Sequence, residues 1–202
     1  MSNAKMKAAG MDLHGEERFG PVMSRIYNVF ASSGVQGLYE FACLDILGKK
    51  GAFSLLDVGT GPGRLPEMLA SRQGRIRIYA VDPSPSMLRI ARNRKGNRGV
   101  KFALGYSRRI PFSLKFGMII STLSFHHWAH KKESLQYLSR FLERRGEIRI
   151  YERVKSGRML DRFVDMHSAG VEELREIAHG TGLRVKGIVV KGKFVRAAYV
   201  KK

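Results

Sequence analysis

At 202 residues the chain can bury one hydrophobic core but is short for two domains. Its 44% hydrophobic and 27% charged residues are the proportions of a globular protein and exclude a chain that is disordered throughout. The 37 Lys and Arg residues against 17 Asp and Glu leave a formal net charge of +20, which internal ion pairs cannot neutralise, so an acidic or polyanionic partner such as RNA stays open.

The first part of the chain has the pattern of helices. From about residue 16 to residue 47 apolar side chains recur every three or four positions, and Ser32-Ser33-Gly34 predicts a break between two helices. We expect residues 1–50 to form an N-terminal helical cap. Three aromatic side chains would close it over the substrate as a lid: Phe19, Tyr27 and Phe30.

After residue 50, short apolar runs of strand type alternate with helical patterns. The predicted strands are 53–58, 77–81, 100–104, 118–123 and 147–151, and the predicted helices are 65–70, 86–92, 133–142 and 171–178. This alternation predicts an α/β fold over residues 51–202, with a Rossmann-like, doubly wound and mostly parallel sheet. Residues 183–190 and 194–200 are separated only by Lys191-Gly192-Lys193, a link too short for a crossover helix, so the last two strands form an antiparallel hairpin.

A glycine-rich loop follows the first predicted strand, where Asp57 to Arg64 reads DVGTGPGR. In an open α/β sheet this strand-to-helix turn lines the ligand crevice. A phosphate-binding P-loop would end in Gly-Lys-Ser/Thr, and a dinucleotide fingerprint counted from Gly59 would need glycine where the chain has Arg64. The loop therefore lets backbone approach a ligand but lacks the residues of either phosphate site, which argues against a nicotinamide-dependent oxidoreductase.

Four segments resemble, in the same order, class I S-adenosylmethionine-dependent methyltransferases of the ubiquinone/menaquinone-biosynthesis branch. They are DVGTGPG at 57–63, VDPSPSML at 81–88, GYSRRIPF at 105–112 and FGMIISTLSFHHW at 116–128. The resemblance covers about residues 53–152 and implies S-adenosylmethionine as the cofactor and methyl transfer as the reaction. One glycine loop is a weak signal, but four segments in the family's order are a strong one.

The resemblance also implies the cofactor-binding residues. Asp82, at the end of the second predicted strand, would accept hydrogen bonds from the ribose hydroxyls, as acidic residues do on a dinucleotide ribose. Tyr106 stands where the family usually has the aspartate that accepts the adenine amino group, so that contact would come from Ser107, a main-chain carbonyl or water. Met87 would lie toward adenine or in the core. The full expected set is Asp57, Gly59, Thr60, Gly61, Gly63, Asp82, Pro83, Met87, Tyr106, Ser107 and Ser121.

Two further segments depart from the family's pattern. Gly117 replaces the aspartate that often precedes the fourth strand, and Glu143-Arg144-Arg145-Gly146 replaces the usual Lys-Pro-Gly-Gly turn before the fifth. We expect both changes to affect local stability more than chemistry.

Two histidines follow the fourth predicted strand. Either His126 or His127 could take the proton from an oxygen or nitrogen acceptor, with Trp128 beside them for stacking or packing. The alternative for each histidine is a backbone hydrogen bond or a place in the pocket wall. The spacing of His126 and His130 would suit zinc, but no third ligand is evident in the sequence, so we expect no metal.

The sequence leaves three functions open. Methyl transfer to a small-molecule or lipid-like acceptor is favoured by the resemblance around the His-His-Trp segment. Methyl transfer to RNA or another polyanion is favoured by the charge. A module that binds S-adenosylmethionine without catalysis is suggested by Tyr106.

The sequence carries no sign of membrane insertion or export. No run approaches the roughly 18 apolar residues of a membrane-spanning helix, and the first residues lack the apolar core of a signal peptide. We therefore expect a cytoplasmic protein without a membrane span. With Cys43 as its single cysteine, the chain can form neither an internal disulfide nor a cysteine zinc site.

Overall fold

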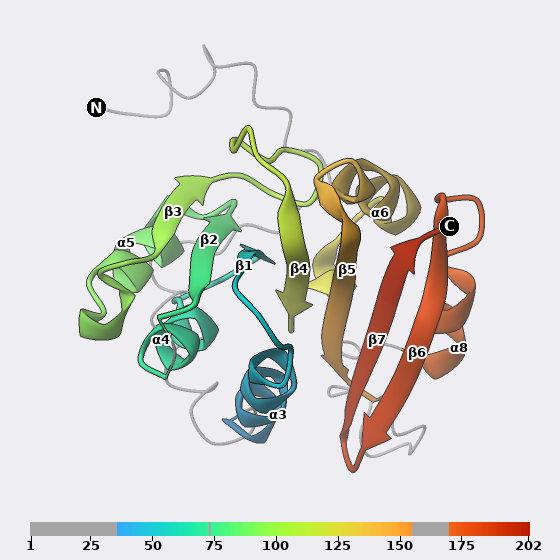
Figure 1. Cartoon of the computed structure of the whole chain (residues 1–202), viewed down its shortest axis with the longest axis horizontal. Helices are drawn as coiled ribbons and strands as arrows, with labels where there is room; N and C mark the ends of the chain where they lie inside the picture. Colours follow the sequence, from blue (N-terminus) through green and yellow to red (C-terminus); the bar gives the residue numbers. More distant parts are fainter. Residues whose placement is uncertain (1–35, 73, 155–169) are drawn as a thin grey trace.

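Seven strands form one sheet in the order β3-β2-β1-β4-β5-β7-β6 (Figure 1). The computed structural model describes residues 36–72, 74–154 and 170–202. Strands β1 to β5 run parallel, and β7 is antiparallel to both β5 and β6. This arrangement confirms the predicted Rossmann-like sheet with an antiparallel C-terminal hairpin. The strands are β1 (Phe53–Val58), β2 (Ile76–Asp82), β3 (Lys101–Leu104), β4 (Phe116–Thr122), β5 (Leu142–Arg153), β6 (Leu183–Lys191) and β7 (Phe194–Lys201).

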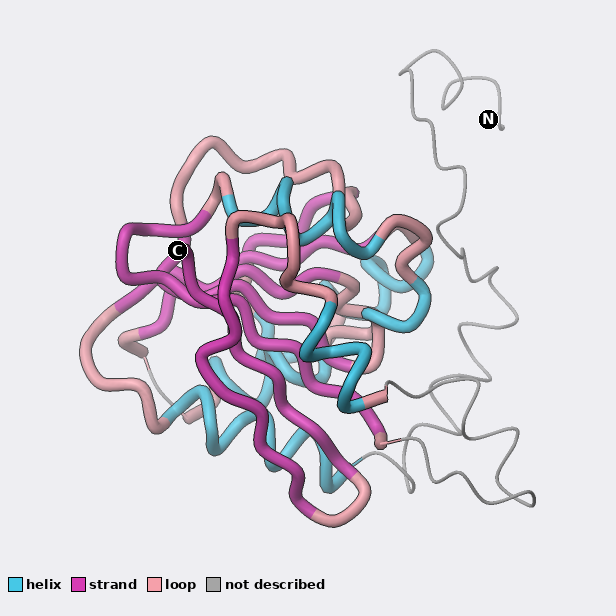
Figure 2. Tube along the Cα trace, turned by 90° about the vertical axis from the view of Figure 1, so that its right-hand side faces the viewer, coloured by secondary structure: helices cyan, strands magenta, loops and turns pink. Residues whose placement is uncertain are grey.

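Helices cover both faces of the sheet (Figure 2). One hydrophobic core lies under α3 and α4, and the other lies under α6 and α8. Strand β4 contributes side chains to both cores, because its alternate residues face opposite sides of the sheet. Met118 and Ile120 belong to the first core and Ile119 to the second. None of the described helices is long and apolar enough to span a bilayer. The helices are α3 (Gln36–Leu47), α4 (Arg64–Ala70), α5 (Pro85–Arg92), α6 (Lys131–Ser139) and α8 (Val171–Glu176), with the 3₁₀ turns η1 (Lys95–Asn97) and η2 (Phe125–His127).

The predicted N-terminal cap is described only in part. Its second helix corresponds to α3, which buries Leu38, Ala42 and Ile46 against the sheet. Residues 1–35, with the expected lid residues Phe19, Tyr27 and Phe30, lie outside the described residues.

Strand β5 begins earlier than predicted and carries a bulge in place of the expected turn at 143–146. Phe116 pairs with Leu142 but Met118 pairs with Glu147, so five steps along β5 oppose two along β4. A Cβ on Gly146 would lie 2.8 Å from the Phe116 carbonyl oxygen, and a Cβ on Gly117 would lie 2.9 Å from the Phe53 Cβ. The bulge therefore leaves no room for a side chain at Gly146, and Phe53 of β1 leaves none at Gly117, which explains the departure from aspartate at position 117.

A network of charged side chains joins α3 to the sheet. Arg149 donates from Nη1 to Asp45 Oδ2 at 2.7 Å and from Nη2 to Glu147 Oε1 at 2.8 Å. The Tyr151 hydroxyl donates to the same Asp45 oxygen at 2.8 Å, and burial raises the pKa of Tyr151 well above its usual value. Alternate residues of a strand share a face, so positions 147, 149 and 151 of β5 all point toward α3.

Candidate functional site

The strand order reverses between β1 and β4. The chain builds outward from β1 through β2 to β3, and then returns to the other side of β1 for β4 and β5. In open α/β sheets, ligands bind in the crevice at the carboxyl ends of the strands beside such a reversal. Most of the predicted site residues lie at this end, in the loops after β1, β2, β3 and β4.

The three glycines of the loop after β1 all have left-handed backbone conformations. Their φ angles are 75° at Gly59, 55° at Gly61 and 71° at Gly63, where a residue with a side chain costs about 1–2 kcal/mol. A Cβ on Gly59 would lie 1.9 Å from Ser124 Oγ, and a Cβ on Gly63 would lie 2.7 Å from the Ala91 Cβ. No atom lies within 4 Å of a Cβ built on Gly61. The absence of a side chain at Gly59 and Gly63 thus allows the loop to pack closely against Ser124 and Ala91, whereas Gly61 has open space beside its backbone.

Asp82 connects the loop after β1 to the loop after β2. The Gly61 N–H donates to Asp82 Oδ2 at 2.7 Å, and the Ser84 N–H donates to Oδ1 at 2.9 Å. Burial raises the pKa of Asp82 to about 6, while these two hydrogen bonds lower it. Because each carboxylate oxygen has a second lone pair, Asp82 can brace the glycine loop and still accept a hydrogen bond from a ligand hydroxyl.

Asp57 is a buried carboxyl near the end of β1. Burial raises its pKa to about 7, the negative charge of Asp82 adds to this rise, and the Thr60 side chain opposes it. Among the described residues, Asp57 Oδ1 and Ser121 Oγ have no hydrogen-bond partner although both are buried. Buried polar atoms in native proteins are nearly always bonded, so these two indicate a ligand that supplies polar partners.

We expect the contribution of Asp57 and Asp82 to the free energy of unfolding to fall between about pH 4 and pH 7. Asp57 and Asp82 keep their protons in the folded protein up to about pH 7 and 6, whereas the unfolded chain releases them near 3.8. The stabilisation is therefore complete below the unfolded pKa and is lost as pH rises through the folded values. Urea unfolding at several pH values measures this, and Asp57→Asn should show a smaller decline than the wild type. A wild-type free energy of unfolding that does not change over this range would contradict the assignment.

Glu152 is a site residue that the sequence reasoning missed. His126 Nδ1 lies 2.9 Å from Glu152 Oε2, and the His126 N–H donates to Oε1 at 3.4 Å. Glu152 is 0% exposed and lies near the end of β5, beside β4. A carboxylate at Nδ1 favours the tautomer that carries its proton there and its lone pair on Nε2. The sequence did carry a signal for Glu152, because it is an acidic residue that follows an apolar strand run, as Asp82 is.

The loop that carries the histidines begins with strained backbone. Leu123 has φ 52°, the single positive value among the non-glycine residues that the structure describes. Such a conformation costs about 1–2 kcal/mol in a residue with a side chain and is often found at functional sites. From there Ser124 lies against the glycine loop, and the rings of His126 and His127 lie 4.0 Å apart between centroids.

The other predicted residues take varied positions. Trp128 is 4% exposed, donates from Nε1 to Ser124 Oγ at 3.3 Å and packs edge-on against Phe125. Met87 is 1% exposed, and the buried Ser107 hydroxyl is 2.8 Å from the Ser134 hydroxyl. Tyr106 and Pro83 are half-buried. In the described part of the chain, no three His, Cys, Asp or Glu side chains gather where they could hold a metal ion.

Comparison with known proteins relates the chain to methyltransferases. Residues 56–150 match the family described as a methyltransferase domain. The ubiquinone/menaquinone biosynthesis C-methyltransferase of Cupriavidus metallidurans is 26% identical over 147 residues, 71% of this chain and 60% of that protein. The malonyl-[acyl-carrier protein] O-methyltransferase of Acetivibrio thermocellus is 33% identical over 100 residues, 48% of this chain and 35% of that protein. The chain thus spans less than two thirds of either relative's length.

The fold comparison extends over nearly the whole chain. A crystal structure of a SAM-dependent methyltransferase from Aquifex aeolicus superposes with a TM-score of 0.73 at 24% identity. The superposition covers 90% of this chain and 97% of that one. The two proteins therefore share one fold over the superposed residues.

Proposed function

Because residues 56–150 belong to the class I S-adenosylmethionine-dependent methyltransferases of the ubiquinone/menaquinone-biosynthesis type, we propose that the chain transfers a methyl group to a small-molecule or lipid-like acceptor. Residues 51–202 would form the catalytic domain. The proposal rests mainly on the open glycine loop, with Asp82 bonded to it and unpartnered polar atoms close by. The two relatives are named for transfer to carbon and to oxygen, and a carbon or hydroxyl acceptor must lose a proton when it is methylated.

The residues of the crevice fit S-adenosylmethionine. The cofactor presents two ribose hydroxyls and an ammonium group as hydrogen-bond donors and carries no phosphate. Asp82 would accept from the ribose hydroxyls, and the unpartnered Asp57 Oδ1 suits a cationic donor. The loop at 59–63 lacks the residues of a phosphate site and leaves open space at Gly61, as such a ligand requires.

His126 would act as the base, with Glu152 as its positioning residue. When bound, the cofactor supplies an electrophilic methyl group, so the protein's main task is to align the acceptor with it. The hydrogen bond from Nδ1 to Glu152 holds the imidazole in place and directs the lone pair on Nε2 to an acceptor proton. The buried negative charge of Glu152 then stabilises the imidazolium that forms.

Gly61→Ala should weaken S-adenosylmethionine binding at least ten-fold, or about 1.4 kcal/mol. Gly51→Ala is the matched control, because Gly51 also has a positive φ and no atom within 4 Å of a built Cβ, but lies before β1. Both variants should lose about 1 kcal/mol of stability through backbone strain. Calorimetric titration with the cofactor then isolates the effect of a methyl group in the crevice. Equal affinities in the two variants would contradict the proposed cofactor site.

The acceptor class is tested by labelling. The purified chain is incubated with methyl-labelled S-adenosylmethionine and a cell extract, which is then separated into small-molecule, lipid, RNA and protein fractions. Label in the small-molecule or lipid fraction, reduced by Gly61→Ala and not by Gly51→Ala, supports the proposal. Label confined to RNA or protein would overturn the acceptor class, and cofactor binding without any labelled product would overturn methyl transfer itself.

A further inference from the structure

One flank of the sheet carries half of the formal net charge of the chain, +10 of +20. Residues 68–112 contain eleven Lys and Arg residues and one acidic residue, Asp82. They form the end of α4, then β2, α5, η1, β3 and the loop after β3, at the left of Figure 1. We call this region the β2–β3 flank. Its exposed basic residues are Arg72, Arg75, Arg77, Arg89, Arg92, Lys95, Arg98, Lys101 and Arg109.

These basic side chains have almost no carboxylate partners. Within the described residues, Arg94 alone among the eleven forms an ion pair, with Glu67 at 2.8 Å. Asp82 is buried and its oxygens are bonded to backbone amides beside the crevice, so it does not neutralise the surface. A patch of like charges repels itself, and a bound polyanion removes that repulsion.

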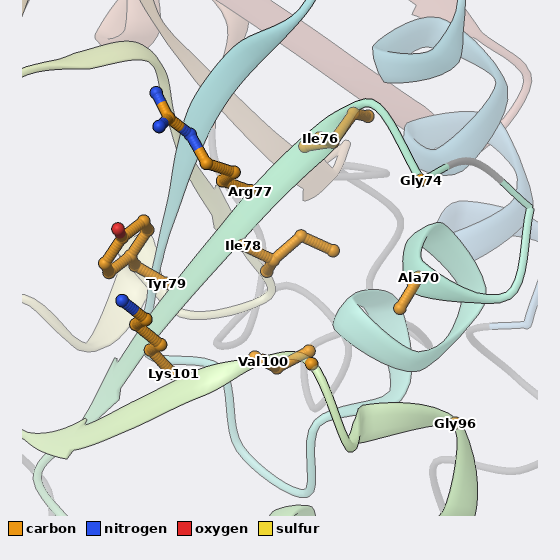
Figure 3. Close-up of a pocket in the computed structure, with 10 residues that line it drawn as sticks. Ala70, Gly74, Ile76, Arg77, Ile78, Tyr79, Gly96, Val100 and Lys101 are labelled. Atoms are coloured by element: carbon orange, nitrogen blue, oxygen red, sulfur yellow. The ribbon is translucent and has the colours of Figure 1, made fainter.

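A pocket of about 380 Å³ opens on this flank, between the end of α4, η1 and the starts of β2 and β3 (Figure 3). It forms because β3 pairs with β2 only from Tyr79 onward, which leaves the edge at Ile76–Ile78 without a strand partner on that side. Arg77, Tyr79 and Lys101 line it and lie on one side of β2, with Lys101 Nζ 5.2 Å from the centre of the Tyr79 ring. The volume lies in the range of roughly 300–1,000 Å³ that is usual for small-ligand sites.

We propose that the β2–β3 flank docks a nucleic acid through its phosphate backbone, with one nucleotide unit in the pocket beside Arg77 and Lys101. Nine of the eleven basic residues are arginines, whose planar guanidinium groups bind phosphate in a bidentate manner. The Tyr79 ring packs edge-on against Phe112 and Phe116 and holds Lys101 over its face at the pocket. The flank is a docking surface separate from the methyl acceptor, so it does not depend on the proposed function.

The apolar residues of the chain argue against other anionic partners. The large exposed hydrophobic residues of the described chain are Leu44, Val189 and Val190, and none lies on the flank. Stable attachment to a lipid surface takes an apolar anchor in addition to basic charge, and a stable protein partner would need an apolar interface core. A phosphate backbone needs neither, because the release of its counterions drives binding.

The test measures binding of a fluorescein-labelled single-stranded RNA of about 20 nucleotides, and of DNA of the same sequence, to the full chain across a salt series. The double variant Arg77→Ala/Lys101→Ala should bind about ten-fold more weakly at low salt. Its slope of log affinity against log salt should be smaller by about 1.4, since each lost contact to a single strand removes about 0.7. The matched control is Arg184→Ala/Lys193→Ala, which removes the same charge from exposed positions at the opposite edge of the sheet. The control should bind within two-fold of the wild type.

Two outcomes support the proposal. In the first, RNA or DNA binds, and Arg77→Ala/Lys101→Ala loses affinity while Arg184→Ala/Lys193→Ala does not. In the second, Gly61→Ala binds the same nucleic acid as tightly as the wild type without added cofactor. Three outcomes would overturn it. They are no binding at low salt, an equal loss in the two double variants, and displacement of the RNA by polyglutamate at equal charge concentration. Vesicles that contain phosphatidylserine should not compete.

Discussion

Replacing Glu147 with alanine should lower the free energy of unfolding by about 3 kcal/mol, because it removes one of the two carboxylates that neutralise the buried Arg149 guanidinium. Glu147 is 3% exposed and forms ion pairs with Arg149 at 2.8 Å, Lys49 at 3.3 Å and Lys186 at 3.2 Å. Burial raises its pKa, but these cations outweigh burial and lower the pKa to about 2. Without Glu147, Arg149 keeps only Asp45, and the contact between α3 and β5 loses part of its support.

Urea unfolding at neutral pH measures the Glu147 effect. Glu143→Ala is the control, since Glu143 is an exposed acid on the same strand and its loss should change the free energy of unfolding by no more than about 0.5 kcal/mol. The wild type should also lose the stabilisation from Glu147 as pH falls from the unfolded value of 4.5 toward 2, and Glu147→Ala should lack that part of the acid dependence. Equal stabilities of Glu147→Ala and Glu143→Ala would show that the network does not hold α3 to the sheet.

Replacing Glu152 with glutamine should lower kcat for methyl transfer about 100-fold, the size of a general-base contribution. A glutamine amide removes the charge that stabilises the imidazolium and can donate to Nδ1, which would favour the opposite tautomer. The affinity for S-adenosylmethionine should stay unchanged, because Glu152 contacts His126 and lies outside the proposed cofactor residues. Steady-state kinetics across pH, together with cofactor titration, separate these effects.

The comparison of histidine variants sharpens that test. His126→Gln should match Glu152→Gln, and the double variant should be little worse than either, because residues that act as one unit are not additive. His130→Gln is the control, since His130 is exposed and lies four residues further along the same loop. A pH profile in Glu152→Gln that keeps its wild-type shape, or a fully additive double variant, would mean that Glu152 only fills space.

The order and the kinds of the elements after residue 50 followed from local pattern. The strand run FGMII is apolar because both faces of β4 are buried, and the link Lys191-Gly192-Lys193 excludes a crossover helix. Strand β5 was harder, because Glu143-Arg144-Arg145-Gly146 has the composition of a turn. Its bulge forms through pairing with β4, where Gly146 lets the backbone of β5 approach the Phe116 carbonyl oxygen, and local propensity does not encode that contact.

The sequence by itself determined the fold class, the glycine loop and the expectation that Asp82 lies at the ligand crevice. These depend on periodicity, on glycine's access to positive φ and on the position of polar residues at strand ends, all of which are local properties. The tertiary structure alone decided that Glu152 meets His126, that Glu147 and Arg149 hold α3, and that scattered basic residues share the β2–β3 flank. Each of these pairings joins segments far apart in the chain, and the packing of strands and helices sets which of them become neighbours.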